Sequence, residues 1–184
     1  MSIRTLTPEA FHVWTADRGI GRTTRDGHSD RLAFTAGGVG GQWPYPGAAA
    51  RVPEFASTLL SAVRRHERYW VSPERGVWSP GRDTEAGPEC RVWMTTVKAL
   101  GVPAGLRGAV GFNSTDWNEL CAMLFLQITL GPCVRIEASV IPETGNAVLN
   151  FEHDRAVWGG FRDQPGLDAV VAAMDRAGYQ PPAG

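Results

Sequence analysis

Hydrophobic positions change their period in the last third of the chain, and this change predicts a helix followed by a β-hairpin. Residues 117–130 (WNELCAMLFLQITL) are apolar on most sides, which is typical of a helix that is buried on most sides. Beyond this segment, apolar and polar residues alternate from residue 134 to 140 within residues 133–142, and again from residue 147 to 152 within residues 147–161. A period of two predicts half-buried antiparallel strands, joined here by a turn at residues 143–146.

The segment before this helix is a dense cluster of capping residues, at positions 113–116 (NSTD), which predicts the helix start. The helix also supplies the clearest candidates for the core. Four large side chains are expected to be almost fully buried, namely Trp117, Leu124, Phe125 and Ile128.

Four further helices are predicted from capping residues and helical periodicity, at residues 8–19, 53–65, 88–100 and 166–177. Shorter strands are predicted at residues 31–36, 69–72, 77–78 and 106–112. The expected fold class is therefore α+β in a single domain of residues 1–184. An antiparallel sheet is built around residues 133–161, and helices 117–130, 53–65 and 166–177 pack on it.

Glycine and proline predict irregular backbone between residues 37 and 47, and residues 20–30 are likewise predicted to be a loop. The glycines of residues 37–41 (GGVGG) do not favour a phosphate cradle, because no lysine follows them and no helix begins directly after them. Trp43 and Tyr45 alternate with prolines and form a stiff apolar surface suited to binding a partner. The alternative is that this loop packs over the core.

Composition narrows the classes of function. A hydrophobic fraction of 43% with 20% charged residues is typical of a soluble globular chain, and a net charge of −1 argues against a nucleic-acid surface. No apolar run predicts a membrane span, and the first residues lack the pattern of a signal peptide. Three cysteines without metal-ligand spacing favour a reduced, cytoplasmic protein, and the preference for arginine, with Lys98 as the sole lysine, is typical of a GC-rich bacterial genome.

The most conspicuous group of titratable residues follows the second strand of the predicted hairpin. On a strand, Glu152 and Asp154 share one face and His153 takes the other, so the three do not converge as a triad or metal site. We expect Glu152 and Asp154 to form a solvent-facing carboxylate pair that contacts a partner, with Arg155 and Trp158 close by. The alternative is an ordinary solvated strand end with His153 partly packed. Trp43 and Tyr45 complete the candidate partner-binding residues. No catalytic residue and no cofactor are predicted, because GxSxG, HExxH and paired CxxC motifs are absent.

The central helix, the hairpin that ends in FEHDRAVW and the closing amphipathic helix resemble small bacterial immunity proteins of polymorphic toxin systems. The resemblance covers residues 113–179. It implies a non-catalytic protein that neutralises a cognate toxin by direct binding. The alternative is a small enzyme, a hydrolase or transferase, whose active site is assembled from loops distant in sequence.

We predict that the purified protein contains no stoichiometric transition metal. Its histidines and cysteines are too scattered along the sequence to form a local ligand pair. Elemental analysis by inductively coupled plasma mass spectrometry tests this expectation. About one zinc or iron per chain would contradict it and would favour the enzyme.

Overall fold

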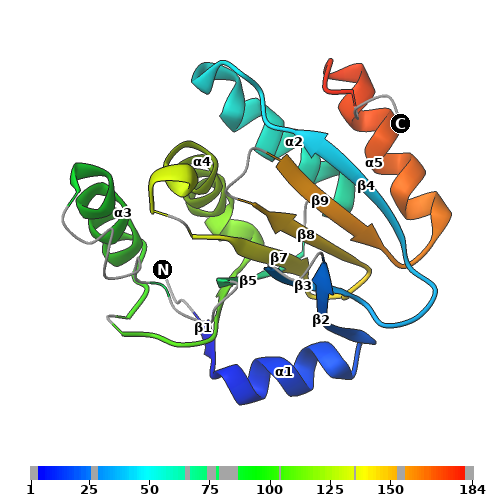
Figure 1. The fold of residues 1–184 in the computed structure, drawn as a ribbon, viewed down its shortest axis with the longest axis horizontal. Coiled ribbons are helices and arrows are strands. Elements are labelled where there is room, and N and C mark those ends of the chain that lie inside the picture. The colour runs from blue at the N-terminus through cyan, green and yellow to red at the C-terminus, as the bar shows by residue number, and fades with distance from the viewer. Residues whose placement is uncertain are drawn as a thin grey trace.

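The computed structural model describes residues 4–25, 29–64, 67–73, 78, 87–103, 105–134, 136–152 and 156–180. Within them a seven-stranded sheet has the strand order β1-β6-β5-β7-β8-β9-β4, and every neighbouring pair is antiparallel (Figure 1). Its strands are β1 (Arg4–Leu6), β4 (Val39–Pro44), β5 (Tyr69–Pro73), β6 (Ala109–Phe112), β7 (Ala138–Pro142), β8 (Ala147–Phe151) and β9 (Ala156–Phe161). A separate antiparallel hairpin joins β2 (Ile20–Arg25) to β3 (Ser29–Phe34).

Within the described residues, five α-helices accompany the sheet, and together they confirm the predicted α+β class. They are α1 (Pro8–Ala16), α2 (Val52–Arg64), α3 (Pro88–Ala99), α4 (Trp117–Val134) and α5 (Gln164–Arg176). Short 3₁₀ turns at Ala49–Arg51 and Ser114–Asp116 lead into α2 and α4. The predicted helix start at residues 113–116 is confirmed, because Asn113 and Asp116 form a capping box in which the Asn113 backbone N–H donates to the Asp116 carboxylate at 3.0 Å.

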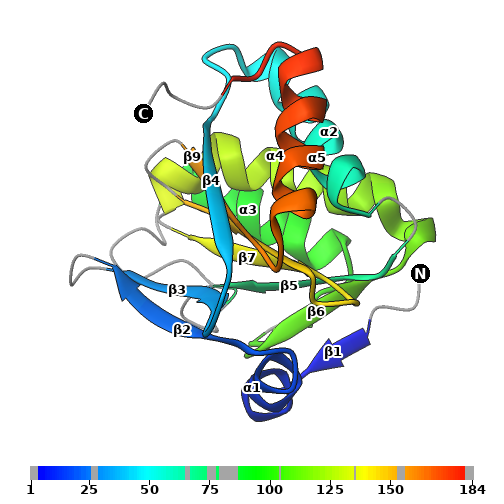
Figure 2. The same cartoon turned by 90° about the vertical axis from the view of Figure 1, so that its right-hand side faces the viewer.

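The sheet lies between two covering layers (Figure 2). Helices α2, α4 and α5 cover one face and enclose the larger hydrophobic core, while α1 and the β2–β3 hairpin cover the opposite face. All residues of β7 and β8 are consequently buried. The prediction of half-buried strands is wrong for this reason: Ile141 and Val148 belong, together with Trp70, to a second core on the opposite face of the sheet.

Helix α4 differs in two ways from its prediction. It continues to Val134, so residues 133 and 134 are helical rather than the start of a strand. Leu124 and Ile128 are buried as expected, whereas Trp117 and Phe125 are only half-buried. Burial at these two positions was overestimated because α4 packs on the sheet, α2 and α3 and leaves part of its surface uncovered.

Two strands, β2 and β4, form where the sequence predicts loops. In β4 and its neighbour β9, glycines make room for aromatic rings of these two strands. A Cβ on Gly40 would lie 3.2 Å from the Trp158 ring, and one on Gly159 would lie 2.9 Å from the Trp43 and Phe161 rings. Glycine therefore serves ring packing in these paired strands instead of marking irregular backbone.

We predict that Gly159→Ala lowers the free energy of unfolding by about 1–3 kcal/mol, because the added methyl group overpacks buried rings. Urea denaturation followed by circular dichroism measures the change. Gly47→Ala is the matched control, since a Cβ there meets nothing within 4 Å. Equal stability of the two variants would contradict the packing argument.

Candidate functional site

Two candidate segments that are far apart in the sequence meet in the structure. Strand β4 pairs with β9, which places Gln42 opposite Trp158 and Trp43 opposite Val157. The Tyr45 hydroxyl donates a hydrogen bond of 2.9 Å to the backbone carbonyl of Glu152. The structure thus brings together four of the six predicted partner-binding residues, and the other two, Asp154 and Arg155, lie outside the described residues.

Trp43 does not form the exposed surface that the sequence predicts. Its side chain is fully buried and packs edge-to-face on Phe161, with ring centroids 6.2 Å apart. The cause is its position on a strand: its ring points toward the helical layer, where Gly41 and Gly159 leave space. Tyr45 is half-buried against Phe55, so the alternative that this segment packs over the core is confirmed.

Glu152 is also not the solvent-facing carboxylate that the sequence predicts, because the β2–β3 hairpin covers its face of the sheet. It forms an ion pair with Arg31 of β3, and the two side chains are only 6% and 15% exposed. Further along this face, the Asn150 amide donates to the Leu32 carbonyl at 3.0 Å, and the Ser139 hydroxyl donates to Asn150 at 2.7 Å. The sequence predicts a strand at Arg31, whereas its pairing with Glu152 depends on the tertiary structure.

These buried polar groups surround a hollow that is too small for a ligand. Its volume is about 10 Å³, at the lower limit for a single water molecule. The polar groups around Arg31 therefore attach the hairpin to the sheet, and they offer no room for a substrate.

The hydrogen bonds between β8 and β9 identify which backbone groups of β4 lie at its outer edge. The backbone N–H of Glu152 donates to the Ala156 carbonyl at 3.1 Å, and that of Arg162 donates to the Asn146 carbonyl at 3.0 Å. Hydrogen-bonded pairs alternate in an antiparallel ladder, so even-numbered residues of β9 bond to β8 and odd-numbered residues bond to β4. Consequently the backbone N–H and C=O groups of Gly40 and Gln42 point away from β9, toward the outer edge.

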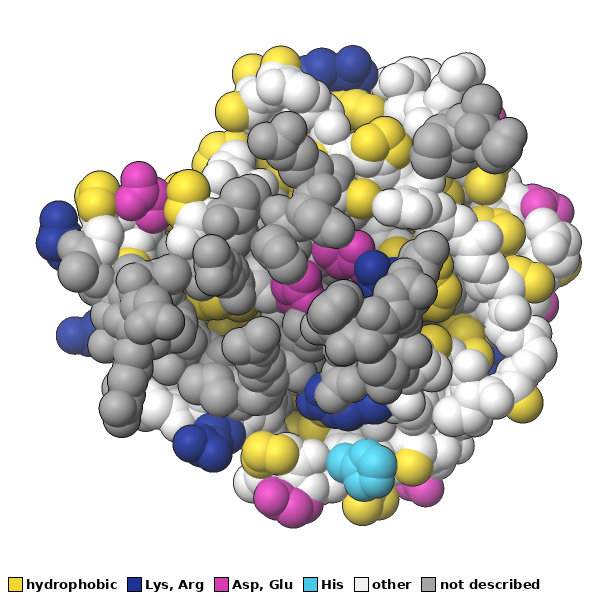
Figure 3. All heavy atoms as spheres, in the orientation of Figure 1, with side chains coloured by type: hydrophobic (Ala, Val, Ile, Leu, Met, Phe, Trp, Pro, Cys, Tyr) yellow, Lys and Arg dark blue, Asp and Glu magenta, His cyan; other side chains and the backbone are white. Residues whose placement is uncertain are grey.

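No described strand pairs with this outer edge. The two ends of the sheet differ in how they are protected. Strand β1 has three residues, including the charged Arg4, whereas β4 has six residues and no charged side chain. Short strands and charges discourage pairing with other chains, so β4 is the less protected edge. Figure 3 shows the surface along β4 mainly in the colours of hydrophobic and other uncharged groups.

An aromatic surface flanks this edge. The Trp158 ring is half-buried and extends over Gly40, one of the two residues of β4 whose backbone groups face outward. Phe34 of β3 lies against Gly38, just before the strand. A chain bound along β4 would therefore meet outward-facing backbone groups and the accessible part of an indole ring.

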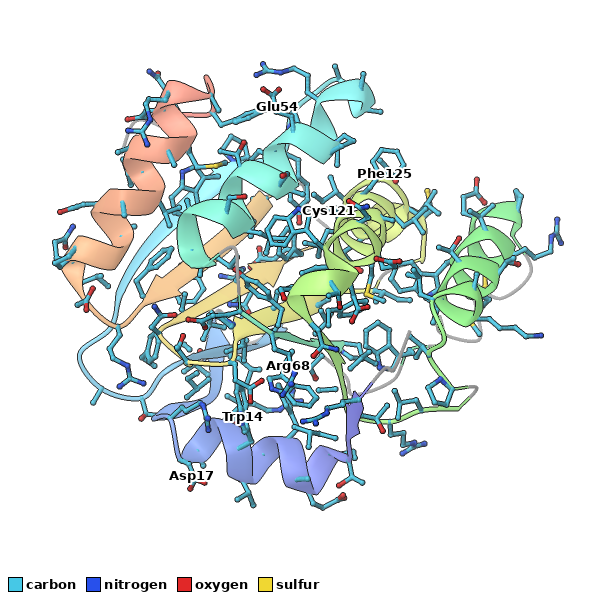
Figure 4. All side chains as sticks on the ribbon, turned by 180° about the vertical axis from the view of Figure 1, so that it is seen from behind. Trp14, Asp17, Glu54, Arg68, Cys121 and Phe125 are labelled. Atoms are coloured by element: carbon cyan, nitrogen blue, oxygen red, sulfur yellow. The ribbon has the colours of Figure 1, made fainter. Side chains whose placement is uncertain are left out.

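Side chains with nucleophilic potential are dispersed. Cys121 lies on α4 (Figure 4), and burial raises the pKa of its thiol, which disfavours the thiolate. Cys90 is buried, and Cys133 is exposed at the end of α4. Among the described residues, no group of three His, Cys, Asp or Glu side chains is placed to hold a metal ion, and no helix is long and apolar enough to cross a membrane.

Comparison of the chain with protein-family models, with curated proteins and with solved structures finds no match. The geometry of the β4 edge is therefore the basis for a functional proposal. The sequence pointed to Trp43, Tyr45 and Trp158 around this edge but not to the outward-facing backbone of Gly40 and Gln42. The alternation of Val39, Gly41 and Trp43 is the signal that could have revealed this strand.

We predict that Glu152→Ala lowers the free energy of unfolding by about 3–5 kcal/mol, because it leaves the Arg31 guanidinium mostly buried without this partner. If the Glu152 carboxylate were solvated, its removal would lower the free energy of unfolding by no more than about 0.5 kcal/mol. Urea denaturation distinguishes the two cases, with Asp17→Ala as the exposed acidic control. The double variant Arg31→Met, Glu152→Leu should recover most of the loss. A Glu152→Ala protein as stable as the control would contradict the buried pairing.

Proposed function

We propose that this protein is a non-catalytic protein-binding module whose partner adds an extended strand to the outer edge of β4. The observation that carries the proposal is the outward direction of the Gly40 and Gln42 backbone groups, which no described strand satisfies. In strand addition, main-chain hydrogen bonds provide affinity, and contacts with alternate side chains provide specificity.

Trp158 supplies the specific contact in this proposal. Its ring lies over Gly40, beside the position that an added strand would take, and it is only half-buried. An apolar side chain of the partner would bury the rest of the indole, and tryptophans buried in this way are enriched among residues that dominate binding energy. Glu152 contributes indirectly through its backbone contact with Tyr45, since its carboxylate is occupied by Arg31.

The resemblance of residues 113–179 to small bacterial immunity proteins supports a toxin as the partner. Such a protein acts by binding alone, and an open sheet edge with an adjacent aromatic ring suits this role. Three cysteines outside disulfide bonds fit a reduced bacterial cytoplasm, where a producing cell would need protection from its own toxin.

The test is binding of the protein that co-purifies with this chain from its native host, measured by calorimetry and, where that protein is toxic, by rescue of growth on co-expression. Gln42→Pro removes an outward N–H without removing a hydrogen bond to β9, and proline is tolerated where an edge strand faces solvent. We expect this variant to bind at least about 5-fold more weakly, as for one lost hydrogen bond. Gln42→Thr keeps the N–H and is the matched control.

Amide hydrogen exchange by NMR gives a second readout. Binding should slow exchange at Gly40 and Gln42, whereas Gly41 and Trp43 are already bonded to β9 and should change little. Trp158→Ala should weaken binding by about 2 kcal/mol or more in a folded protein. Equal affinity of the Gln42→Pro and Gln42→Thr proteins, or unchanged exchange at Gly40 and Gln42 in the complex, would overturn the proposal.

A further inference from the structure

A cavity of about 240 Å³ is lined by residues of α3 and of the segment that follows this helix. Figure 1 shows α3 at the opposite end of the molecule from β4. Val97, Val102 and Leu106 line the cavity together with Trp78 and Met94. Ligand pockets for drug-sized molecules usually measure about 300–1,000 Å³, so this cavity suits a smaller molecule. Its mainly apolar lining favours an apolar tail.

The cavity is formed by well-anchored groups. The Trp78 indole N–H donates to the Gly108 carbonyl at 3.1 Å, and the Trp93 indole N–H donates to the Trp78 carbonyl at 3.0 Å. Beyond α3 the chain turns sharply, and the Val102 N–H bonds back to the Val97 carbonyl at 3.1 Å. Because these groups are already fixed before a ligand binds, binding does not incur the entropic cost of ordering the cavity walls.

The polar groups of the cavity favour a ligand with a negatively charged group. Two of the described lining residues have polar side chains, Thr95 and Lys98, and both are exposed, while none of the described lining residues is acidic. Lys98 is also the only lysine of the chain. Its flexible stem can pack along the apolar wall and place the ammonium group at the mouth of the cavity.

We propose that this cavity binds a small amphiphilic carboxylate, with its short alkyl or aryl tail among the apolar side chains and its carboxylate paired with Lys98. The hydroxyl of Thr95 is positioned on the same wall and can donate a hydrogen bond to the same anionic group. The site is separate from β4, so the proposal does not depend on the strand-addition function.

Calorimetric titration with octanoate tests the proposal. Wild-type protein should bind it, and Thr95→Trp should abolish binding by filling the cavity. Val92→Trp is the matched control, because Val92 lies on the same helix, is exposed and does not line the cavity. Lys98→Ala should weaken octanoate binding by about 2- to 5-fold, the range for a partly exposed ion pair, and Lys98→Arg should retain it. Binding of neutral 1-octanol should be the same in wild-type and Lys98→Ala proteins.

The single lysine permits an independent measurement. An amine-reactive reagent modifies Lys98 and the N-terminal amine, and peptide mapping by mass spectrometry separates the two products. Octanoate should protect Lys98 and leave the rate at the N-terminus unchanged. Absence of binding to wild-type protein, or binding to folded Thr95→Trp protein with wild-type affinity, would overturn the site. Equal octanoate affinity of the Lys98→Ala protein would overturn the carboxylate pairing.

Discussion

Burial of the central strands on both faces is the constraint on which the rest of this structure depends. Each strand has to place alternate residues in two different cores, one under the helices and one under α1 and the β2–β3 hairpin. A sheet of this kind leaves no solvated face for polar side chains. The polar residues that occur on the inner strands therefore need partners inside the protein.

The polar groups on the second face show how this need is met. Asn150 and Ser139 hydrogen-bond across neighbouring strands and to the Leu32 carbonyl, and Glu152 pairs with Arg31. These hydrogen bonds and this ion pair fix the position of the hairpin on the sheet, because each requires a particular geometry. Apolar contacts alone would allow the hairpin to pack in other positions. The ion pair also removes Glu152 from the set of side chains that can reach a partner.

The two-sided cover leaves an edge of the sheet accessible at β4, and it leaves a cavity beside α3. At β4, tryptophan packing requires glycine and so produces a strand without charged side chains. The same packing that stabilises the end of the sheet thus leaves its last edge unprotected. At α3 the chain turns back beside the helix and encloses an apolar cavity next to Lys98.

The sequence by itself determined the features that depend on neighbouring residues: the helices, the capping at Asn113, the hairpin of β7 and β8, and the α+β class. It also identified Trp43, Tyr45, Glu152 and Trp158, which the structure brings together. The tertiary structure alone decided that residues 39–44 form a strand, that Trp43 and Glu152 are buried, and that the Gly40 and Gln42 backbone faces outward. The physical reason is that helical periodicity and capping are local, whereas the pairing of β4 with β9 and the cover provided by β2 and β3 join segments far apart in the chain.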